Sequence, residues 1–248
     1  MIDFGRTSLD YARYRIPFSL RLFERLQQSK IGCAGQHVLD LGAGTGLLGA
    51  GLKDRGCVVT SIDPSIELLG RSESSGSRVA GCAEILPFEN DCFDVIAAAQ
   101  CWHWFDRHAA PREIHRVLKP GGSVAVIYQT YIPLPDGIAE RTEKLILRHH
   151  PGWRHANSTG INGQVLRDLQ INRFIDIESF SFDIEAPFSR EAWQGYIRTT
   201  SAVGASMTPE QLLLFDHEHA EFLKDEPEPM RIPHRIFAAV ARKPGSSV

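Results

Sequence analysis

Apolar runs and amphipathic stretches alternate along the first half of the chain. Leu20, Phe23 and Leu26 recur at a helical spacing and predict one buried helix face. The apolar runs that follow are short, as in buried strands, and helical segments separate them. This alternation predicts an α/β fold, with parallel strands and helices on both faces of the sheet. The expected elements are helices at 19–28, 47–56 and 109–118, a strand running into the glycines of 36–44, and strands at 57–63, 79–82, 93–99 and 123–128.

The pattern changes after residue 128. Pro133 and Pro135, and then a polar stretch rich in Gly, His and Asn at 149–164, indicate an insertion or lid. The expected elements in this half are helices at 137–149, 191–203 and 209–226, a strand at 174–188 and a final strand at 235–243 that returns to the sheet. A chain of 248 residues suits one large α/β domain, and we expect a single domain.

Composition narrows the class of protein. With 43% hydrophobic and 23% charged residues, the chain should fold. The net charge of −3, from 27 basic and 30 acidic residues without a basic run, disfavours a nucleic-acid substrate. The five cysteines form no CxxC pair, so we expect reduced thiols and no metal. The polar N-terminus and the lack of an apolar run of about 18 residues predict a cytoplasmic protein without an anchor, whether monomer or homodimer.

Three glycines at alternate positions, Gly42, Gly44 and Gly46, follow the apolar run VLDL. Glycine lets the backbone turn sharply and approach a ligand where a β-carbon would clash, although such a turn can also be purely structural. The dinucleotide fingerprint G-x-G-x-x-G requires a glycine where this chain has Leu47, which disfavours a nicotinamide or flavin cofactor. Asp63 ends the next apolar run, where a carboxylate can accept both hydroxyls of a ribose or cap the following helix.

Four segments in this order resemble the motifs of the class I S-adenosylmethionine-dependent methyltransferases, in particular the type 11 subgroup. They are VLDLGAGTG, IDPS, AEILPFENDCFDVIAAAQCWHWFD and EIHRVLKPGGSVAV, and they cover about residues 36–128. YARYRIPFSL and GYIRTTSAV also resemble small-molecule methyltransferases of the trans-aconitate type. The resemblance implies a Rossmann-like class I methyltransferase fold with a late cap or lid insertion. It also implies S-adenosyl-L-methionine as cofactor, S-adenosyl-L-homocysteine as product and a small-molecule acceptor.

The resemblance also implies how the chain is divided. We expect one methyltransferase domain over 1–248, with N-terminal lid helices at 1–35 and a cofactor-binding core at 36–128. A cap with late sheet elements that specifies the substrate follows at 129–231, and a final strand and tail at 232–248.

The expected cofactor contacts are carried over from the family motifs. Asp40 and the glycines surround the methionine part, Asp63 binds the ribose, and Ala83 and Glu84 lie beside the adenine. Cys82 stands where the family often has an acid. The contact expected there is therefore made by the backbone of Ala83 instead of an acidic side chain. The full set is Tyr14, Arg15, Asp40, Gly42, Ala43, Gly44, Gly46, Asp63, Pro64, Cys82, Ala83, Glu84, Gln100 and Trp102.

Aromatic and titratable groups gather in the run CWHWFD after the fourth expected strand. Trp102 or Trp104 can offer an aromatic face to the positive sulfonium, or can fill the core. His103 is the candidate catalytic residue, as a general base, and a structural or cofactor-side histidine is the alternative. Arg15 either meets the methionine carboxylate or is a solvated surface arginine.

The acceptor is expected to be recognised after residue 128. The candidates for substrate contact are Trp104, Tyr131, His149, Trp153 and Tyr196. His149, His150 and His155 lie near one another but lack an HExxH pattern, so solvated or substrate-facing histidines are favoured over a metal site. A protein or RNA acceptor, loss of transfer, or use of the sulfonium for cyclisation or elimination remain alternatives.

Overall fold

The computed structural model describes residues 7–72 and 76–245. Residues 1–6 of the expected N-terminal lid and residues 246–248 of the tail lie outside this range. The described chain divides into two compact units. Unit 1 holds residues 7–16, 130–161 and 182–235, and unit 2 holds 17–72, 76–129, 162–181 and 236–245. Residues 162–181, which the sequence placed in the cap, therefore cluster with the expected cofactor core.

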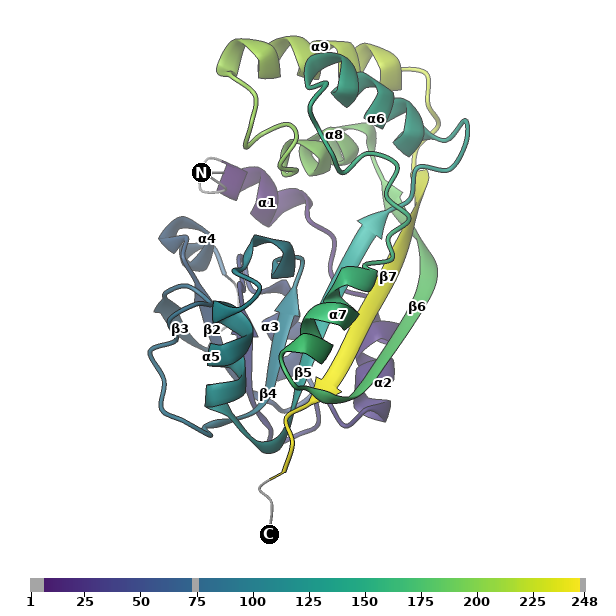
Figure 1. The fold of residues 1–248 in the computed structure, drawn as a ribbon. Helices are drawn as coiled ribbons and strands as arrows, with labels where there is room; N and C mark the ends of the chain where they lie inside the picture. The colour runs from purple at the N-terminus through teal and green to yellow at the C-terminus, as the bar shows by residue number, and fades with distance from the viewer. Residues whose placement is uncertain (1–6, 73–75, 246–248) are drawn as a thin grey trace. The chain divides into compact units, whose positions relative to one another are not determined.

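The sheet has the strand order β3-β2-β1-β4-β5-β7-β6 (Figure 1). Pairing is parallel from β3 to β5. β7 runs against β5, because Gly121 bonds to Lys243 near one end of the pair and Ile132 bonds to Pro233 at the other. The strands are β1 (His37–Leu41), β2 (Val58–Asp63), β3 (Ser77–Ala80), β4 (Phe93–Ala99), β5 (Leu118–Tyr131), β6 (Ile175–Phe188) and β7 (Met230–Arg242). The expected α/β class with a mostly parallel sheet is confirmed.

Several helices begin where a hydroxyl side chain caps the first turn. Ser19, Ser65, Ser189 and Thr208 each accept a backbone N–H three residues further on, which satisfies one otherwise unpaired donor. The helices are α1 (Ser8–Tyr14), α2 (Leu20–Gln28), α3 (Leu47–Lys53), α4 (Ile66–Gly70), α5 (Ala109–Val117), α6 (Ile138–His149), α7 (Gly163–Ile171), α8 (Arg190–Arg198) and α9 (Pro209–Leu223), with a 3-10 turn η2 (Trp102–Trp104).

Both faces of the sheet in unit 2 are buried. Ile96 and Ala97 are successive residues of β4 that point to opposite faces, and neither is more than 1% exposed. On one face, α5 and α7 share a core with the strands, through residues such as Ile114 and Leu169. Burial on both faces explains why the strands appear in the sequence as continuous apolar runs.

Two sequence expectations about helices are corrected. Leu20 is 71% exposed, and the buried face of α2 consists of Leu22, Phe23 and Leu26. The sequence also predicted no element between the polar stretch at 149–164 and the strand at 174–188, whereas α7 lies there. Its buried side chains are few, so the helical period was weak beside the Gly- and Asn-rich residues that precede it.

Unit 1 is built from α1, α6, α8 and α9 together with the chain segments of the three last strands that belong to it. Its core is rich in aromatic rings, with Trp193 and Phe215 fully buried. α1 packs closely on α8, because a β-carbon on Gly195 would lie 2.1 Å from the ring of Tyr14. Within the described ranges, none of the helices has the length and apolarity needed to cross a bilayer.

The first prediction concerns the contact between α2 and α3. A β-carbon on Gly51 would lie 2.2 Å from Cζ of Phe23, whose ring is buried and is covered by the Arg55 guanidinium at 4.1 Å. We expect Gly51→Ala to lower the free energy of unfolding by about 1–3 kcal/mol, although alanine favours a helix over glycine by up to about 1 kcal/mol.

Gly70 in α4 is the matched control, since a β-carbon there meets nothing within 4 Å. Gly70→Ala should leave stability unchanged or slightly higher. Urea denaturation of both variants measures the difference, and equal stability of the two variants would contradict the packing argument.

Candidate functional site

The loop after β1 turns through three glycines in the left-handed region. The φ angles of Gly42, Gly44 and Gly46 are +67°, +55° and +79°, which side-chain-bearing residues rarely adopt. The backbone N–H groups of Gly42 and Ala43 both donate to the carbonyl oxygen of Ile62, at 2.9 and 3.0 Å. The beginning of the loop is thereby fixed against the end of the neighbouring strand β2.

Asp63 joins this loop to the start of α4. One carboxylate oxygen accepts the N–H of Gly44 and the other accepts the N–H of Ser65, both at 2.8 Å. Burial raises the pKa of Asp63 although both backbone bonds favour the ionised form. Each carboxylate oxygen can accept a second hydrogen bond, so the group retains capacity for a ligand hydroxyl.

Asp40 lies beneath α3. It is 1% exposed, and its Oδ2 accepts the N–H of Gly49 at 3.0 Å. Burial, with a smaller contribution from the charge of Asp63, raises the pKa of Asp40 to about 7. A β-carbon on Gly49 would lie 2.8 Å from the same oxygen. The contact that the structure gives this carboxylate is therefore with the helix backbone, and its contact with a cofactor ammonium stays a prediction.

The segment after β3 contributes residues of different exposure. Cys82 is exposed, whereas Ala83 is 3% exposed. Glu84 accepts the backbone N–H of Asp106 through Oε1 at 2.9 Å. The carboxylate expected beside the adenine thus ties its own loop to the loop that follows β4.

Gln100 begins that second loop with a φ of +62°, unusual for a residue with a side chain. Its backbone N–H donates to Ile127 O at 2.8 Å, and its side-chain amide donates to the carbonyl oxygen of Gln129. Next along the chain, Cys101 Sγ donates to Leu41 O at 3.1 Å. The loop after β4 is therefore attached to both neighbouring strands, β1 and β5.

The aromatic run separates into buried and exposed members. Trp102 is 4% exposed, which agrees with the core-filling interpretation, and Trp104 is 42% exposed. His103 is exposed, with its Nδ1 lying 3.3 Å from the hydroxyl oxygen of Tyr128. Burial raises the pKa of Tyr128, so its hydroxyl keeps its proton at neutral pH. A tautomer in which Nδ1–H donates to this hydroxyl places the imidazole lone pair on Nε2.

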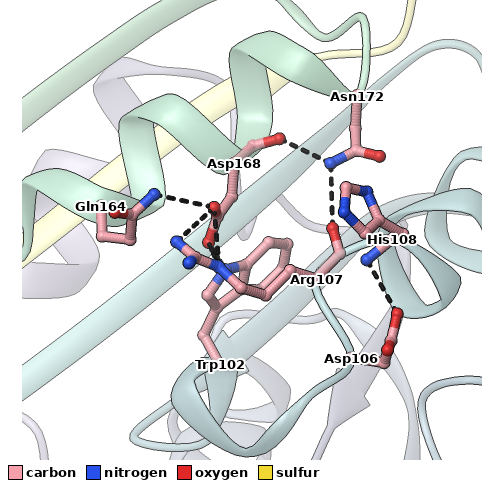
Figure 2. Close-up of polar contacts among 7 residues, drawn as sticks. All are labelled: Trp102, Asp106, Arg107, His108, Gln164, Asp168 and Asn172. Atoms are coloured by element: carbon pink, nitrogen blue, oxygen red, sulfur yellow. Dashed lines mark hydrogen bonds and ion pairs between the residues drawn. The ribbon is translucent and has the colours of Figure 1, made fainter.

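Asp168 on α7 holds the same loop from the other side (Figure 2). Its carboxylate accepts from Trp102 Nε1 at 3.1 Å, from Arg107 Nη2 at 2.8 Å and from Gln164 Nε2 at 3.1 Å. Asn172 adds a bond from its side-chain amide to the carbonyl oxygen of Arg107 at 3.2 Å. A helix from late in the sequence is thereby attached to the loop after β4.

A family model described as a methyltransferase domain matches residues 39–126, the region from β1 into β5 that holds both loops. Residues 39–126 therefore match a methyltransferase domain in sequence. The resemblance drawn from the sequence motifs is confirmed.

Curated relatives match part of this chain. An uncharacterised methyltransferase of Mycobacterium tuberculosis is 39% identical over 132 residues, which are 52% of this chain and 53% of that protein. A malonyl-[acyl-carrier protein] O-methyltransferase of Dechloromonas aromatica is 35% identical over 43% of this chain and 41% of its own length. The chain spans about half the length of the curated relatives it matches.

Solved structures match over more of the chain. A protein of Anaeromyxobacter dehalogenans assigned as a type II methyltransferase aligns with a TM-score of 0.66 and 22% identity over 94% of this chain and 99% of its own. Phosphoethanolamine N-methyltransferase 2 of Haemonchus contortus, in complex with S-adenosyl-L-methionine, aligns with a TM-score of 0.55 and 17% identity over 97% of this chain and 56% of its own. At such identities the likeness shows the fold alone.

Two of the expected cofactor-binding residues, Tyr14 and Arg15, lie in unit 1 instead of unit 2. The Tyr14 hydroxyl donates to Glu191 at 2.7 Å. The Arg15 guanidinium lies 4.7 and 4.9 Å from the ring centres of Tyr11 and Tyr196, with its Nε buried and without a partner. Arg15 is therefore a packed arginine, which corrects the interpretation of a solvated surface residue, and cofactor contact by either residue stays a prediction.

The acceptor candidates other than Trp104 also lie in unit 1. Tyr131 and Tyr196 are 6% and 3% exposed, and their rings meet edge to face at 6.3 Å. His149 Nε2 lies 3.3 Å from a carboxylate oxygen of Glu218, and Trp153 packs half-buried against the aromatic core. The histidine cluster does not form in space as a ligand set: within 7–72 and 76–245, no group of three or more metal-ligating side chains is gathered.

Sequence reasoning missed Asp168, Arg107 and Tyr128. A signal for Asp168 was present, because Gln164 and Asp168 are four residues apart, as are the buried Val165 and Leu169. Tyr128 is the last residue of the fifth expected strand, and only the neighbouring position of β4 and β5 brings it to His103.

The burial of Asp40 predicts a pH dependence of stability. Because its folded-state pKa of about 7 lies above the ordinary value of 3.8, the folded chain binds this proton more tightly than the unfolded chain. This group therefore makes the free energy of unfolding fall as the pH rises from about 4 to 7. Asp40→Asn removes that contribution while an amide oxygen can still accept from Gly49.

Urea unfolding of wild type and Asp40→Asn at pH 5 and pH 8 tests this. We expect the stability of the variant relative to wild type to be greater at pH 8 than at pH 5. An offset that does not change with pH would contradict the assignment of the raised pKa to Asp40.

Proposed function

We propose that this chain transfers a methyl group from S-adenosyl-L-methionine to a small-molecule acceptor by in-line displacement, with the cofactor bound by unit 2. The supporting observation is the position of the glycine loop. The strand order reverses between β1 and β4, and ligands of open α/β sheets bind at the carboxyl ends of the strands at such a reversal. The loops after β1 and β4 and the carboxylate of Asp63 lie at that edge.

The residues present suit this cofactor. A cradle of left-handed glycines admits a ligand that a β-carbon would exclude, and Asp63 retains acceptor capacity for ribose hydroxyls. The loop at 82–84 and the loop beginning at Gln100 would flank the adenine and the methionine part. When bound, the sulfonium supplies the activated methyl group, and the protein contributes mainly positioning.

Relatives and structural neighbours favour a small acceptor. They include a ubiquinone/menaquinone biosynthesis C-methyltransferase of Vibrio parahaemolyticus and the phosphoethanolamine N-methyltransferase of Haemonchus contortus. Trp104, Tyr131, His149, Trp153 and Tyr196 remain the candidates for contact with the acceptor.

Mass spectrometry of products from a metabolite panel tests the reaction: a gain of one methylene unit supports transfer, and a product without it supports the cyclisation or elimination alternative. If only a protein or RNA fraction becomes methylated, the small-molecule proposal fails.

Asp63 gives the sharpest test of the cofactor site. We expect Asp63→Ala to weaken binding of S-adenosylhomocysteine about tenfold to a hundredfold, as for a lost charge-assisted hydrogen bond worth about 1.5–3 kcal/mol. Isothermal titration calorimetry measures the affinity, and circular dichroism checks the fold.

Ser65→Ala is the control for the neighbouring helix cap. Its hydroxyl accepts from Leu68 N at 3.2 Å, so the variant should lose about 1 kcal/mol of stability and keep cofactor affinity within a few-fold. Unchanged affinity in a folded Asp63→Ala protein would refute the ribose assignment.

His103 is tested as a proton acceptor for a hydroxyl substrate. With this role, His103→Ala should reduce turnover about 100-fold to 10,000-fold at intact cofactor affinity. His103→Asn distinguishes a positioning role from a proton-accepting role, because an amide can keep a hydrogen bond near Tyr128 but takes up no proton near neutrality. Near-full activity of His103→Asn at saturating cofactor would eliminate the base and leave positioning.

A further inference from the structure

The Asp168 carboxylate receives more hydrogen-bond donors than the single partner of a simple ion pair. Its side chain is 3% exposed, and it accepts hydrogen bonds from Trp102, Arg107 and Gln164. A buried carboxylate is costly unless its oxygens are paired, and here two of the three partners belong to the loop after β4. The conformation of that loop therefore depends on a helix that lies more than 60 residues later in the chain, since Trp102 and Asp168 are 66 residues apart.

α7 is a firm anchor for this carboxylate. Val165 and Leu169, on the same helix, are 1% and 0% exposed and belong to the core shared with the sheet. Asn172, directly after α7, donates to Arg107 O at 3.2 Å and to Asp168 O at 2.7 Å. The position of the Asp168 side chain is thus set by core packing and by a second bond to the same loop (Figure 2).

The loop that Asp168 holds lies directly against the glycine loop. A β-carbon on Gly42 would lie 2.7 Å from Cys101 Sγ and 3.6 Å from the ring of Phe105. Trp102 stands between these two residues in sequence, and its ring lies 5.9 Å from that of Phe105. The indole held by Asp168 thus packs beside Phe105, one of the two side chains that lie against Gly42, and directly follows the other in sequence.

The same loop also reaches the expected adenine side. The backbone N–H of Asp106 donates to Glu84 at 2.9 Å, and Asp106 precedes Arg107, the main ionic partner of Asp168. Within the loop, Trp104 N–H donates to Cys101 O and Phe105 N–H to Trp102 O. The side chains of Trp102 and Arg107 attach the loop to α7.

We propose that Asp168 is a positioning residue of the cofactor site, which sets the affinity for S-adenosylmethionine through Trp102 and Arg107 without touching the cofactor. The inference rests on the proposed function only for the affinity measurement that tests it. The loop contacts that it describes are independent of any reaction. Residues of α7, which the sequence placed in the cap, would then act on the cofactor instead of the acceptor.

Asp168→Asn is the principal variant. The amide keeps one acceptor oxygen but turns its NH₂ group toward the N–H donors of Trp102 or Arg107, so at least one bond is lost. We expect the dissociation constant of S-adenosylhomocysteine to rise about tenfold, equivalent to 1.4 kcal/mol. The KM for S-adenosylmethionine should rise with kcat changed less than twofold, as when uniform binding is lost.

Arg107→Gln is the milder variant, since this arginine is half-exposed and Trp102 and Gln164 keep their bonds to Asp168. Its affinity loss should be smaller than that of Asp168→Asn. Asp176→Asn is the matched control, because this aspartate is also in unit 2 and forms an exposed ion pair with Arg242 at 3.5 Å. The control should leave cofactor affinity unchanged.

The indole N–H resonance of Trp102 in a ¹H–¹⁵N spectrum supplies a readout that does not need a ligand. It should shift upfield in Asp168→Asn, with faster amide hydrogen exchange at 101–107, and stay in place in Asp176→Asn. Lower thermal stability with unchanged affinity and KM in both Asp168→Asn and Arg107→Gln would make the contact merely structural and overturn the proposal. If wild type binds no S-adenosylhomocysteine, the proposed function fails instead, and an unshifted indole resonance would still refute the loop attachment.

Discussion

The carboxylate of Asp63 brings together two backbone segments on which the rest of the site depends. It accepts the N–H of Gly44 on the loop after β1 and the N–H of Ser65 before α4. The parallel register makes this possible, because Leu41 and Ile62 are paired at the ends of their strands. A charged acceptor that receives backbone N–H donors forms stronger hydrogen bonds than a neutral one, which helps to hold the loop with its three left-handed glycines in place.

Close packing then constrains what surrounds this loop. Cys101 and Phe105 occupy the space that a side chain at residue 42 would need, and Asp40 fills the space next to Gly49. Glycine is required at both positions for lack of room, and at residue 42 also for its left-handed backbone. The consequence is that the surroundings of the glycine loop are shared among β1, the loop after β4 and α7, none of which is adjacent in sequence to the others.

Unit 1 follows a different principle, with polar groups buried among aromatic rings. Burial lowers the pKa of His219 to about 3 and that of His234 to about 4, so both are neutral at physiological pH. Burial also raises the pKa of Glu143. Such groups favour one packing arrangement over others when they are hydrogen-bonded, as the Trp193 indole is to Thr142 at 3.0 Å.

The sequence alone determined the α/β class and nearly every strand, because strands buried on both faces leave apolar runs. It also determined the methyltransferase motifs of residues 39–126, because the glycines and Asp63 must stand at fixed places in a parallel unit. It did not reveal α7, whose few buried residues carry a weak helical period, or the burial of Leu22 in place of Leu20. Only the tertiary structure placed Asp168 against Trp102 and Tyr128 beside His103, and Arg15 among aromatic rings in unit 1. Contacts between residues distant in sequence are decided by packing, and no local pattern encodes them.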